Sequence, residues 1–212
     1  MERSAQPTGE EKFSSFKGPW EKLAYVVSTV TNPLFVALPL CLLVAIATAP
    51  NVWQGLLWWV VTAVGVSLAP LIFVWQGVRR GRYTDHHVSR REQRLVPMLF
   101  ATGCVALVFV GLLLLHASSH LLATMVAVIV AVLLALIITK FTKISLHMVG
   151  MAGAVTVIIL MYGPIFLSLT PLVFVVGWAR WQVRAHTSFQ ALIGTVLAAV
   201  VTVITFRLFG LF

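Results

Sequence analysis

Seven long apolar runs, separated by short polar or proline-containing breaks, constrain this chain more than any other feature of its sequence. They cover residues 23–48, 53–77, 96–116, 119–140, 145–162, 165–180 and 188–211. A helix needs about 17–25 mainly apolar residues to cross the hydrocarbon core of a bilayer. Only helices and closed barrels can pair all their backbone groups in lipid. The runs therefore predict an all-α, polytopic integral membrane helical bundle with about seven transmembrane helices.

The break at Gly163-Pro164 decides the number of spans. Residues 145–181 are too long for one helix and barely long enough for two. We expect a tight hairpin of two short helices, and a single kinked helix is the alternative that gives six spans. The expected organisation is a cytoplasmic N-terminal tail over residues 1–22 and a transmembrane domain over residues 23–212.

The basic residues predict the orientation in the membrane. The chain has 15 Lys and Arg against 6 Asp and Glu. With seven spans, every basic residue except Arg207 falls on the face that carries the N-terminus. By the positive-inside rule this face is cytoplasmic. Beyond residue 21 the only acidic residues are Asp85 and Glu92, so a carboxylate-rich site for magnesium diphosphate is strongly disfavoured.

Two polar clusters lie on the predicted cytoplasmic face before the last two spans. In the first, residues 79–97, the basic residues alone are typical of a cytoplasmic loop, but His87, Arg91 and Arg94 add groups able to bind an anion. In the second, residues 140–147, Lys143 and Ser145 precede a helix that begins near His147. A helix start favours an anion, because its backbone N–H groups are unpaired. In the alternative, Ser145 only caps the helix.

The third cluster, residues 177–190, contains Arg180, His186 and Gln190. This Arg-x5-His-x3-Gln spacing resembles the third signature, S-R-x5-H-x3-D, of the type 2 phosphatidic acid phosphatase family. Ser145-Leu-His147 resembles the end of that family's P-S-G-H signature, and residues 90–97 resemble its K-x6-R-P signature, with Arg94 at the arginine. His87 stands where that signature begins with Lys, and Gln190 stands in place of the Asp.

The resemblance implies a metal-independent lipid phosphatase with no cofactor, a divergent member of this family. His186 would be the nucleophile that forms a phosphohistidine, His147 the general acid and base, and Gln190 the group that orients His186. The substrate phosphate would be bound by the remaining candidates, namely Arg94, Arg180, Lys143, Ser145, His87 and Arg91. The expected partners are the lipid bilayer and a lipid phosphate of the phosphatidate or polyprenyl type, with no nucleic acid.

Three other classes of protein stay open at this point. A catalytically weak or inactive lipid-phosphate-binding protein is the main alternative, because Gln190 lacks the charge of an Asp. A membrane prenyltransferase is disfavoured by the shortage of carboxylates. A transporter more often keeps ionisable groups in the middle of its spans, and these spans have almost none. The sequence does not indicate an oligomeric state or name the lipid.

Overall fold

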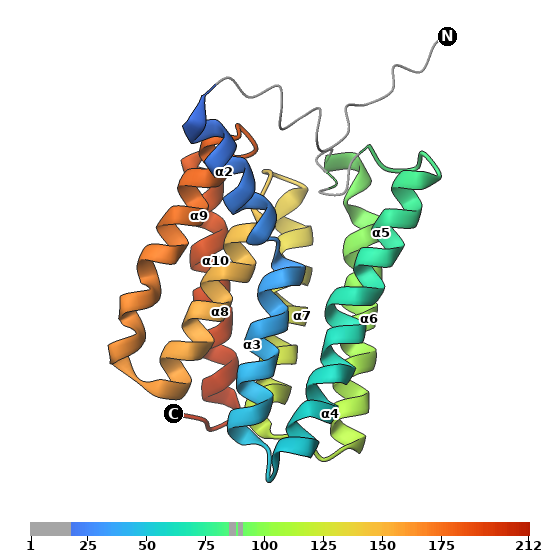
Figure 1. Cartoon of the computed structure of the whole chain (residues 1–212), viewed down its shortest axis with the longest axis vertical. Coiled ribbons are helices and arrows are strands. Elements are labelled where there is room, and N and C mark those ends of the chain that lie inside the picture. The colour runs from blue at the N-terminus through green and yellow to red at the C-terminus, as the bar shows by residue number, and fades with distance from the viewer. Residues whose placement is uncertain (1–17, 85–87, 89–90) are drawn as a thin grey trace.

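The computed structural model describes residues 18–84, 88 and 91–212, and these residues form helices joined by short connections (Figure 1). The elements are α2 (Pro19–Val30), α3 (Pro33–Thr48), α4 (Val52–Thr62), the π-helical η1 (Ala63–Leu68), α5 (Ala69–Arg79), the 3₁₀ turn η2 (Arg91–Gln93), α6 (Leu95–Leu114), α7 (Ser119–Thr139), α8 (Leu146–Tyr162), the 3₁₀ segment η3 (Pro164–Leu169), α9 (Thr170–Gln182) and α10 (Ser188–Leu208). No strand occurs in the described part of the chain. The predicted all-α membrane bundle is confirmed.

The helical segments match the predicted apolar runs. Five are long and apolar enough to cross a membrane unaided, namely Val52–Arg79, Leu95–Leu114, Ser119–Thr139, Pro164–Gln182 and Ser188–Leu208. α2 and α3 pass the same test together, although they are bent by 52° at the break between them. α8 is a shorter apolar helix of 17 residues, about 25 Å long at the rise of an α-helix. Each predicted run thus has its helical counterpart.

The chain reverses direction at Gly163-Pro164. α8 ends at Tyr162, and Gly163 has φ of +91°, a conformation that residues with a β-carbon rarely adopt. Pro164 lacks the backbone N–H that a continuing helix would need. Figure 1 shows α9 returning beside α8 from this turn. The hairpin prediction is therefore confirmed, and the single kinked helix is wrong.

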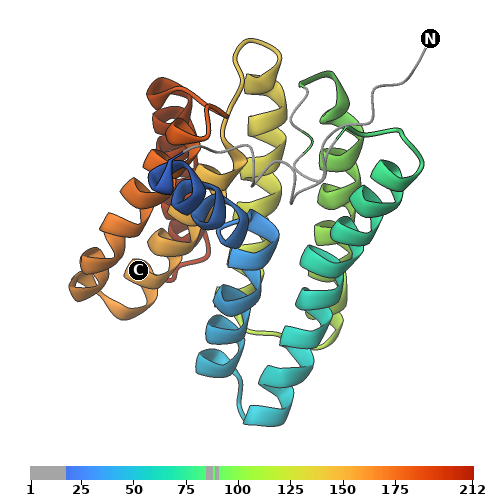
Figure 2. The same cartoon turned by 45° about the horizontal axis from the view of Figure 1, so that its top comes forward.

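One end of the bundle carries the polar connections. The start of α2 and the α5–α6, α7–α8 and α9–α10 connections all lie at this end, which we call the basic end, and the C-terminus lies at the other (Figures 1 and 2). The predicted tail boundary at residue 22 falls inside α2. Helix α2 begins earlier because Gly18 is extended and Pro19 suits the first helical position.

Close helix contacts at the basic end depend on glycine. α8 packs against α3, α7, α9 and α10. A β-carbon on Gly194 of α10 would lie 2.9 Å from the Ser145 carbonyl oxygen, and one on Gly150 of α8 would lie 2.9 Å from Cβ of Pro33. These distances are shorter than real β-carbon contacts. The two glycines therefore let α3 and α10 approach α8 where the second and third polar clusters meet.

Candidate active site

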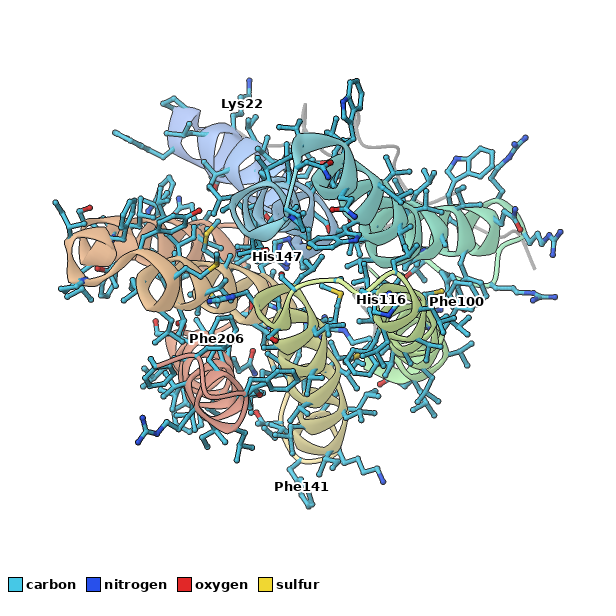
Figure 3. The ribbon with its side chains drawn as sticks, turned by 90° about the horizontal axis from the view of Figure 1, so that it is seen from below. Lys22, Phe100, His116, Phe141, His147 and Phe206 are labelled. Atoms are coloured by element: carbon cyan, nitrogen blue, oxygen red, sulfur yellow. The ribbon has the colours of Figure 1, made fainter. Side chains whose placement is uncertain are left out.

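Five of the predicted site residues are buried at the basic end of the bundle. His147 is 6% exposed, Arg94, Arg180 and His186 are each 7% exposed, and Ser145 is fully buried. Figure 3 shows His147 in the interior of the bundle, whereas Lys22 and Phe141 point outward at its edge. Burying charged and polar side chains is costly unless they have partners. These side chains therefore need partners in the protein or in a bound ligand.

The spacing of Arg180 and His186 is set by the way α9 ends. The N–H groups of Ala185 and His186 donate to the Arg180 carbonyl oxygen at 3.0 and 3.3 Å, and the N–H of Arg184 donates to Trp181. This is a Schellman turn, with Arg184 in the left-handed position at φ of +53°. The turn folds the chain back over the last turn of α9. His186 is thereby held next to Arg180.

Gln190 sets the tautomer of His186. The Nδ1 atom of His186 lies 3.2 Å from Oε1 of Gln190, and the same Oε1 accepts the N–H of Thr187 at 3.3 Å. Thr187 and Gln190 form the capping box of α10, which fixes this atom as the amide oxygen. An oxygen here only accepts, so His186 carries its hydrogen on Nδ1. The lone pair of the neutral ring is then on Nε2.

Three cations surround His186. The pKa of His186 is lowered from 6.5 to about 3, chiefly by burial and then by the charges of Arg180, Lys143 and Arg94. The hydrogen bond that His186 donates to Gln190 raises the pKa, but this effect is the weakest of those acting on the ring. At neutral pH the imidazole is therefore uncharged and able to act as a nucleophile. The convergence of cations also suits the binding of an anion such as phosphate.

Hydrogen bonds join the three polar clusters. Arg94, the N-cap residue of α6, donates from Nε to the Val88 carbonyl oxygen at 3.1 Å and from Nη1 to the Ile144 carbonyl oxygen at 3.2 Å. Lys143 donates from Nζ to the Ala185 carbonyl oxygen at 3.0 Å. Arg94 thus links the first cluster to the second, and Lys143 links the second to the third. The structure brings together what the sequence places far apart.

Ser145 does not cap α8, so the capping alternative is wrong. It occupies the N-cap position, but its side chain makes no capping hydrogen bond. Its buried hydroxyl has no hydrogen-bond partner among the described residues. Buried polar atoms without a partner are uncommon in native proteins. The Ser145 hydroxyl is therefore a group that a bound ligand can satisfy.

Sequence reasoning missed Ser28 of α2, which contacts two site residues. Its hydroxyl accepts a hydrogen bond from Nη1 of Arg180. Its carbonyl oxygen lies 3.0 Å from Nε2 of His147. Ser28 is 3% exposed. The only sequence signal was the Asn32-Pro33 pair, which indicates a break in the first apolar run and hence a separate, differently directed α2.

Two of the predicted phosphate-binding residues are not tested by the structure. His87, like Asp85, lies outside the described residues. Arg91 begins the 3₁₀ turn η2, of which only the backbone is described at this residue. In the described part of the chain, no three His, Cys, Asp or Glu side chains come together as metal ligands do. Independence of metal ions stays a prediction.

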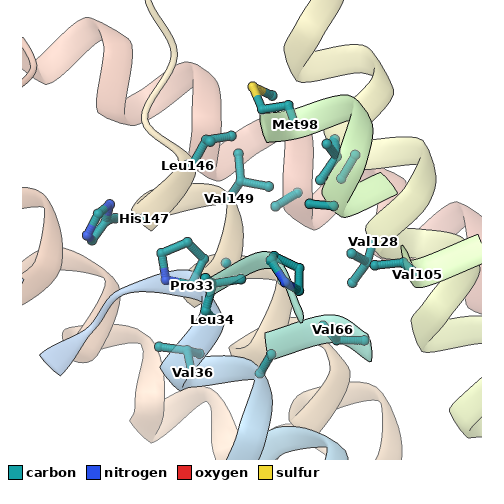
Figure 4. A pocket seen from close by; sticks show the side chains of 18 of the residues that line it. Pro33, Leu34, Val36, Val66, Met98, Val105, Val128, Leu146, His147 and Val149 are labelled. Carbon is teal, nitrogen blue, oxygen red and sulfur yellow. The ribbon is translucent and has the colours of Figure 1, made fainter. Parts of the chain in front are cut away.

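An apolar cavity begins at these polar side chains and continues between the helices. Its volume is about 250 Å³. Arg94, His147, Arg180 and His186 line it at the basic end, and mostly apolar residues of α3, η1, α5, α6, α7, α8 and α10 line the remainder. Figure 4 shows His147 beside the apolar side chains of Pro33, Leu146 and Val149. The cavity therefore suits a ligand with an anionic head and an apolar tail.

His186 also lines a second, more open space outside the first. This space has a volume of about 550 Å³ and is lined by Lys143, Trp181, Arg184, Gln190 and their neighbours in the α9–α10 connection. Most of its lining residues are polar, and Trp181 and Ala185 are the exceptions. The imidazole of His186 thus lies between a largely apolar cavity within the bundle and a polar space at its end.

Comparisons with family models, with curated proteins and with solved structures find no match for this chain. The interpretation of the site therefore depends on its own residues and contacts.

Proposed function

We propose that the chain is a metal-independent lipid phosphatase that hydrolyses a lipid phosphate at the basic end of the bundle. The observation that carries this proposal is the single cavity that joins a cationic head, containing two histidines, to a long apolar lining. A lipid phosphate has the same two parts. The resemblance of the three polar clusters to the type 2 phosphatidic acid phosphatase family supports the same activity.

In the first half of the proposed reaction, Nε2 of His186 attacks the phosphorus atom. The bond between phosphorus and the lipid oxygen breaks, and its electron pair leaves with that oxygen, which takes a proton from His147. Arg94 and Arg180 stabilise the charge on the phosphoryl oxygens. The Gln190 oxygen accepts the Nδ1–H of His186 as the ring gains positive charge. The products of this half are a lipid alcohol and a phosphohistidine.

In the second half, a water molecule attacks the phosphorus atom of the phosphohistidine. His147 accepts a proton from this water, the phosphorus–nitrogen bond breaks, and its electron pair returns to Nε2 of His186. Phosphate is then released and His147 again carries its proton. The polar space lined by Lys143 and Arg184 suits the entry of water and the exit of phosphate. We assign the basic end to the cytoplasmic side by the positive-inside rule.

The proposal is tested by measuring phosphate release from a panel of lipid phosphates by the purified protein in detergent, with a chelator present. His186→Ala removes turnover but keeps lipid-phosphate binding, because Arg94 and Arg180 remain. Arg180→Ala weakens binding and turnover together. Arg207→Ala is the matched control, since this arginine bonds to the Phe212 carbonyl oxygen at the other end of the bundle.

A fully active His186→Ala protein rules out the covalent mechanism, and activity that needs magnesium rules out the metal-independent one. One alternative function has a specific observation in its favour. Gln190 holds His186 in the reactive tautomer but supplies no negative charge for the imidazolium. Wild-type protein that binds lipid phosphates and releases no phosphate from any of them is therefore a lipid-phosphate-binding protein.

A further inference from the structure

The break between α2 and α3 leaves the Ser28 backbone carbonyl without its usual helical donor. In a continuous helix the N–H of Asn32 would donate to the Ser28 carbonyl oxygen. Here it donates to Thr29 at 3.2 Å instead, and Pro33 has no N–H to donate to Thr29 in its place. The Asn32 side chain caps the start of α3 by accepting the N–H of Leu34 at 3.0 Å. The break is therefore encoded by Asn32 and Pro33.

The Ser28 carbonyl oxygen, which lacks its helical donor, accepts a hydrogen bond from His147 instead. The distance from the Ser28 carbonyl oxygen to Nε2 of His147 is 3.0 Å. A carbonyl oxygen only accepts hydrogen bonds, so Nε2 of His147 must carry a hydrogen. The other nitrogen, Nδ1, is then the one that can give and take a proton while this bond is kept.

The hydroxyl of the same residue contacts Arg180. Ser28 on α2 therefore joins His147 on α8 to Arg180 on α9. α2 lies along α9 at this end of the bundle (Figures 1 and 2), where Trp20 and Trp178 meet edge to face with their ring centres 6.4 Å apart. This packing holds Ser28 in place.

We infer that Ser28 is a positioning residue for the proposed reaction. Its carbonyl keeps a hydrogen on Nε2 of His147, so Nδ1 of the imidazolium gives its proton to the leaving lipid oxygen, and Nδ1 of the resulting neutral Nε2–H tautomer takes one back from water. Its hydroxyl orients the Arg180 guanidinium that binds the phosphate. The role in catalysis rests on the proposed function, whereas the tautomer of His147 can be measured without it.

Ser28→Ala removes one of the two contacts, and a second variant removes both, so the difference between them reports on the carbonyl. Ser28→Ala removes the hydroxyl and keeps the carbonyl, so KM rises about 10- to 100-fold while kcat changes little, as expected for the loss of a hydrogen bond to a charged group. Ser28→Thr restores the hydroxyl and with it the KM. Thr29→Ala is the matched control, because the Thr29 hydroxyl donates to the Tyr25 carbonyl oxygen within α2 and its loss leaves KM unchanged.

The second variant, Asn32→Ala with Pro33→Ala, removes the cap and restores the missing N–H. α2 and α3 become continuous, and the Ser28 carbonyl then accepts the N–H of residue 32 instead of the hydrogen of His147. We expect kcat to fall about 100-fold, in the range of general acid–base catalysis. KM rises as in Ser28→Ala, because straightening the 52° bend also moves the Ser28 hydroxyl away from Arg180. Nitrogen chemical shifts of labelled histidine, assigned with His147→Gln, show the Nε2–H tautomer in the wild type and its loss in this double variant.

Two results overturn the inference. One is a wild-type His147 whose neutral ring carries its hydrogen on Nδ1 and none on Nε2, and the other is Ser28→Ala kinetics indistinguishable from those of Thr29→Ala. If the wild type hydrolyses no lipid phosphate, the proposed function fails, and the histidine spectra still decide whether Ser28 sets the tautomer.

Discussion

Gly194 lies where α10 meets the start of α8, and we predict that Gly194→Ala strongly reduces the activity of the site. The added β-carbon would lie 2.9 Å from the Ser145 carbonyl oxygen and 3.1 Å from Cβ of Met148. An ordinary contact needs about 3.4 Å or more, so α10 must move away from the start of α8 by several tenths of an ångström. Overpacking of this kind costs roughly 1–3 kcal/mol of stability.

The displacement affects function more than stability. α10 begins directly after His186, and α8 carries His147 in its first turn, so the shift changes the position of one histidine relative to the other. A misplacement of about 1 Å can reduce a rate about 100-fold. We therefore expect the rate of phosphate release to fall at least about 10-fold. The unfolding temperature in detergent falls by several degrees.

Gly153→Ala is the matched control for this experiment. Gly153 lies on α8 in the same interface, but a β-carbon there would be 3.9 Å from Ala198 and from Thr202, an ordinary contact. Alanine is also the better helix former, so this variant keeps its activity and gains stability. If Gly194→Ala behaves like Gly153→Ala, close contact between α8 and α10 does not assemble the site.

Three further predictions concern the α9–α10 connection. Gln190→Glu keeps the capping box and adds a charge beside the imidazolium, so kcat rises; an unchanged or lower kcat contradicts the proposed role of residue 190. Arg184→Gly relieves the left-handed strain at φ of +53° and raises the unfolding temperature in detergent by a few degrees, about 1 kcal/mol; a lower temperature refutes this. The pKa of His186 is lower in the folded protein than in the unfolded chain, so between pH 6.5 and about 3 His186 is protonated mainly in the unfolded chain. The free energy of unfolding therefore falls as the pH drops from 6.5 towards 3. In His186→Gln, unfolding temperatures from pH 7 to pH 4.5 fall less steeply than in the wild type; parallel curves contradict the shift.

The arrangement of the spans could be predicted because the bilayer imposes it. Helix length is set by membrane thickness, and Gly163-Pro164 carries a local turn signal. With a hairpin there, all three polar clusters must reach one end of the bundle. The meeting of Arg94, Arg180, His147 and His186 followed from that topology, together with the spacing of the clusters.

The contacts within the site could not be predicted in the same way. Ser28 is 119 residues from His147 and 152 residues from Arg180 along the chain, and their contacts depend on how α2 packs against α9. The alternative that Ser145 only caps α8 could not be excluded from the sequence, because a serine at an N-cap position can make a capping hydrogen bond and here makes none. The apolar cavity likewise depends on how the helices pack. Its lining residues are of the kinds found throughout transmembrane helices, so the sequence alone does not distinguish them.

Transfer of labelled phosphate to the protein tests the central claim most directly. Wild-type protein, His186→Ala and Arg207→Ala are mixed with a lipid carrying a radioactive phosphate, quenched in alkali and separated from lipid. The account predicts label on the wild type and on Arg207→Ala that is stable in alkali and lost in acid, as expected of a phosphohistidine, and none on His186→Ala. Phosphate release by the wild type without any such label, or equal labelling of His186→Ala, would contradict it.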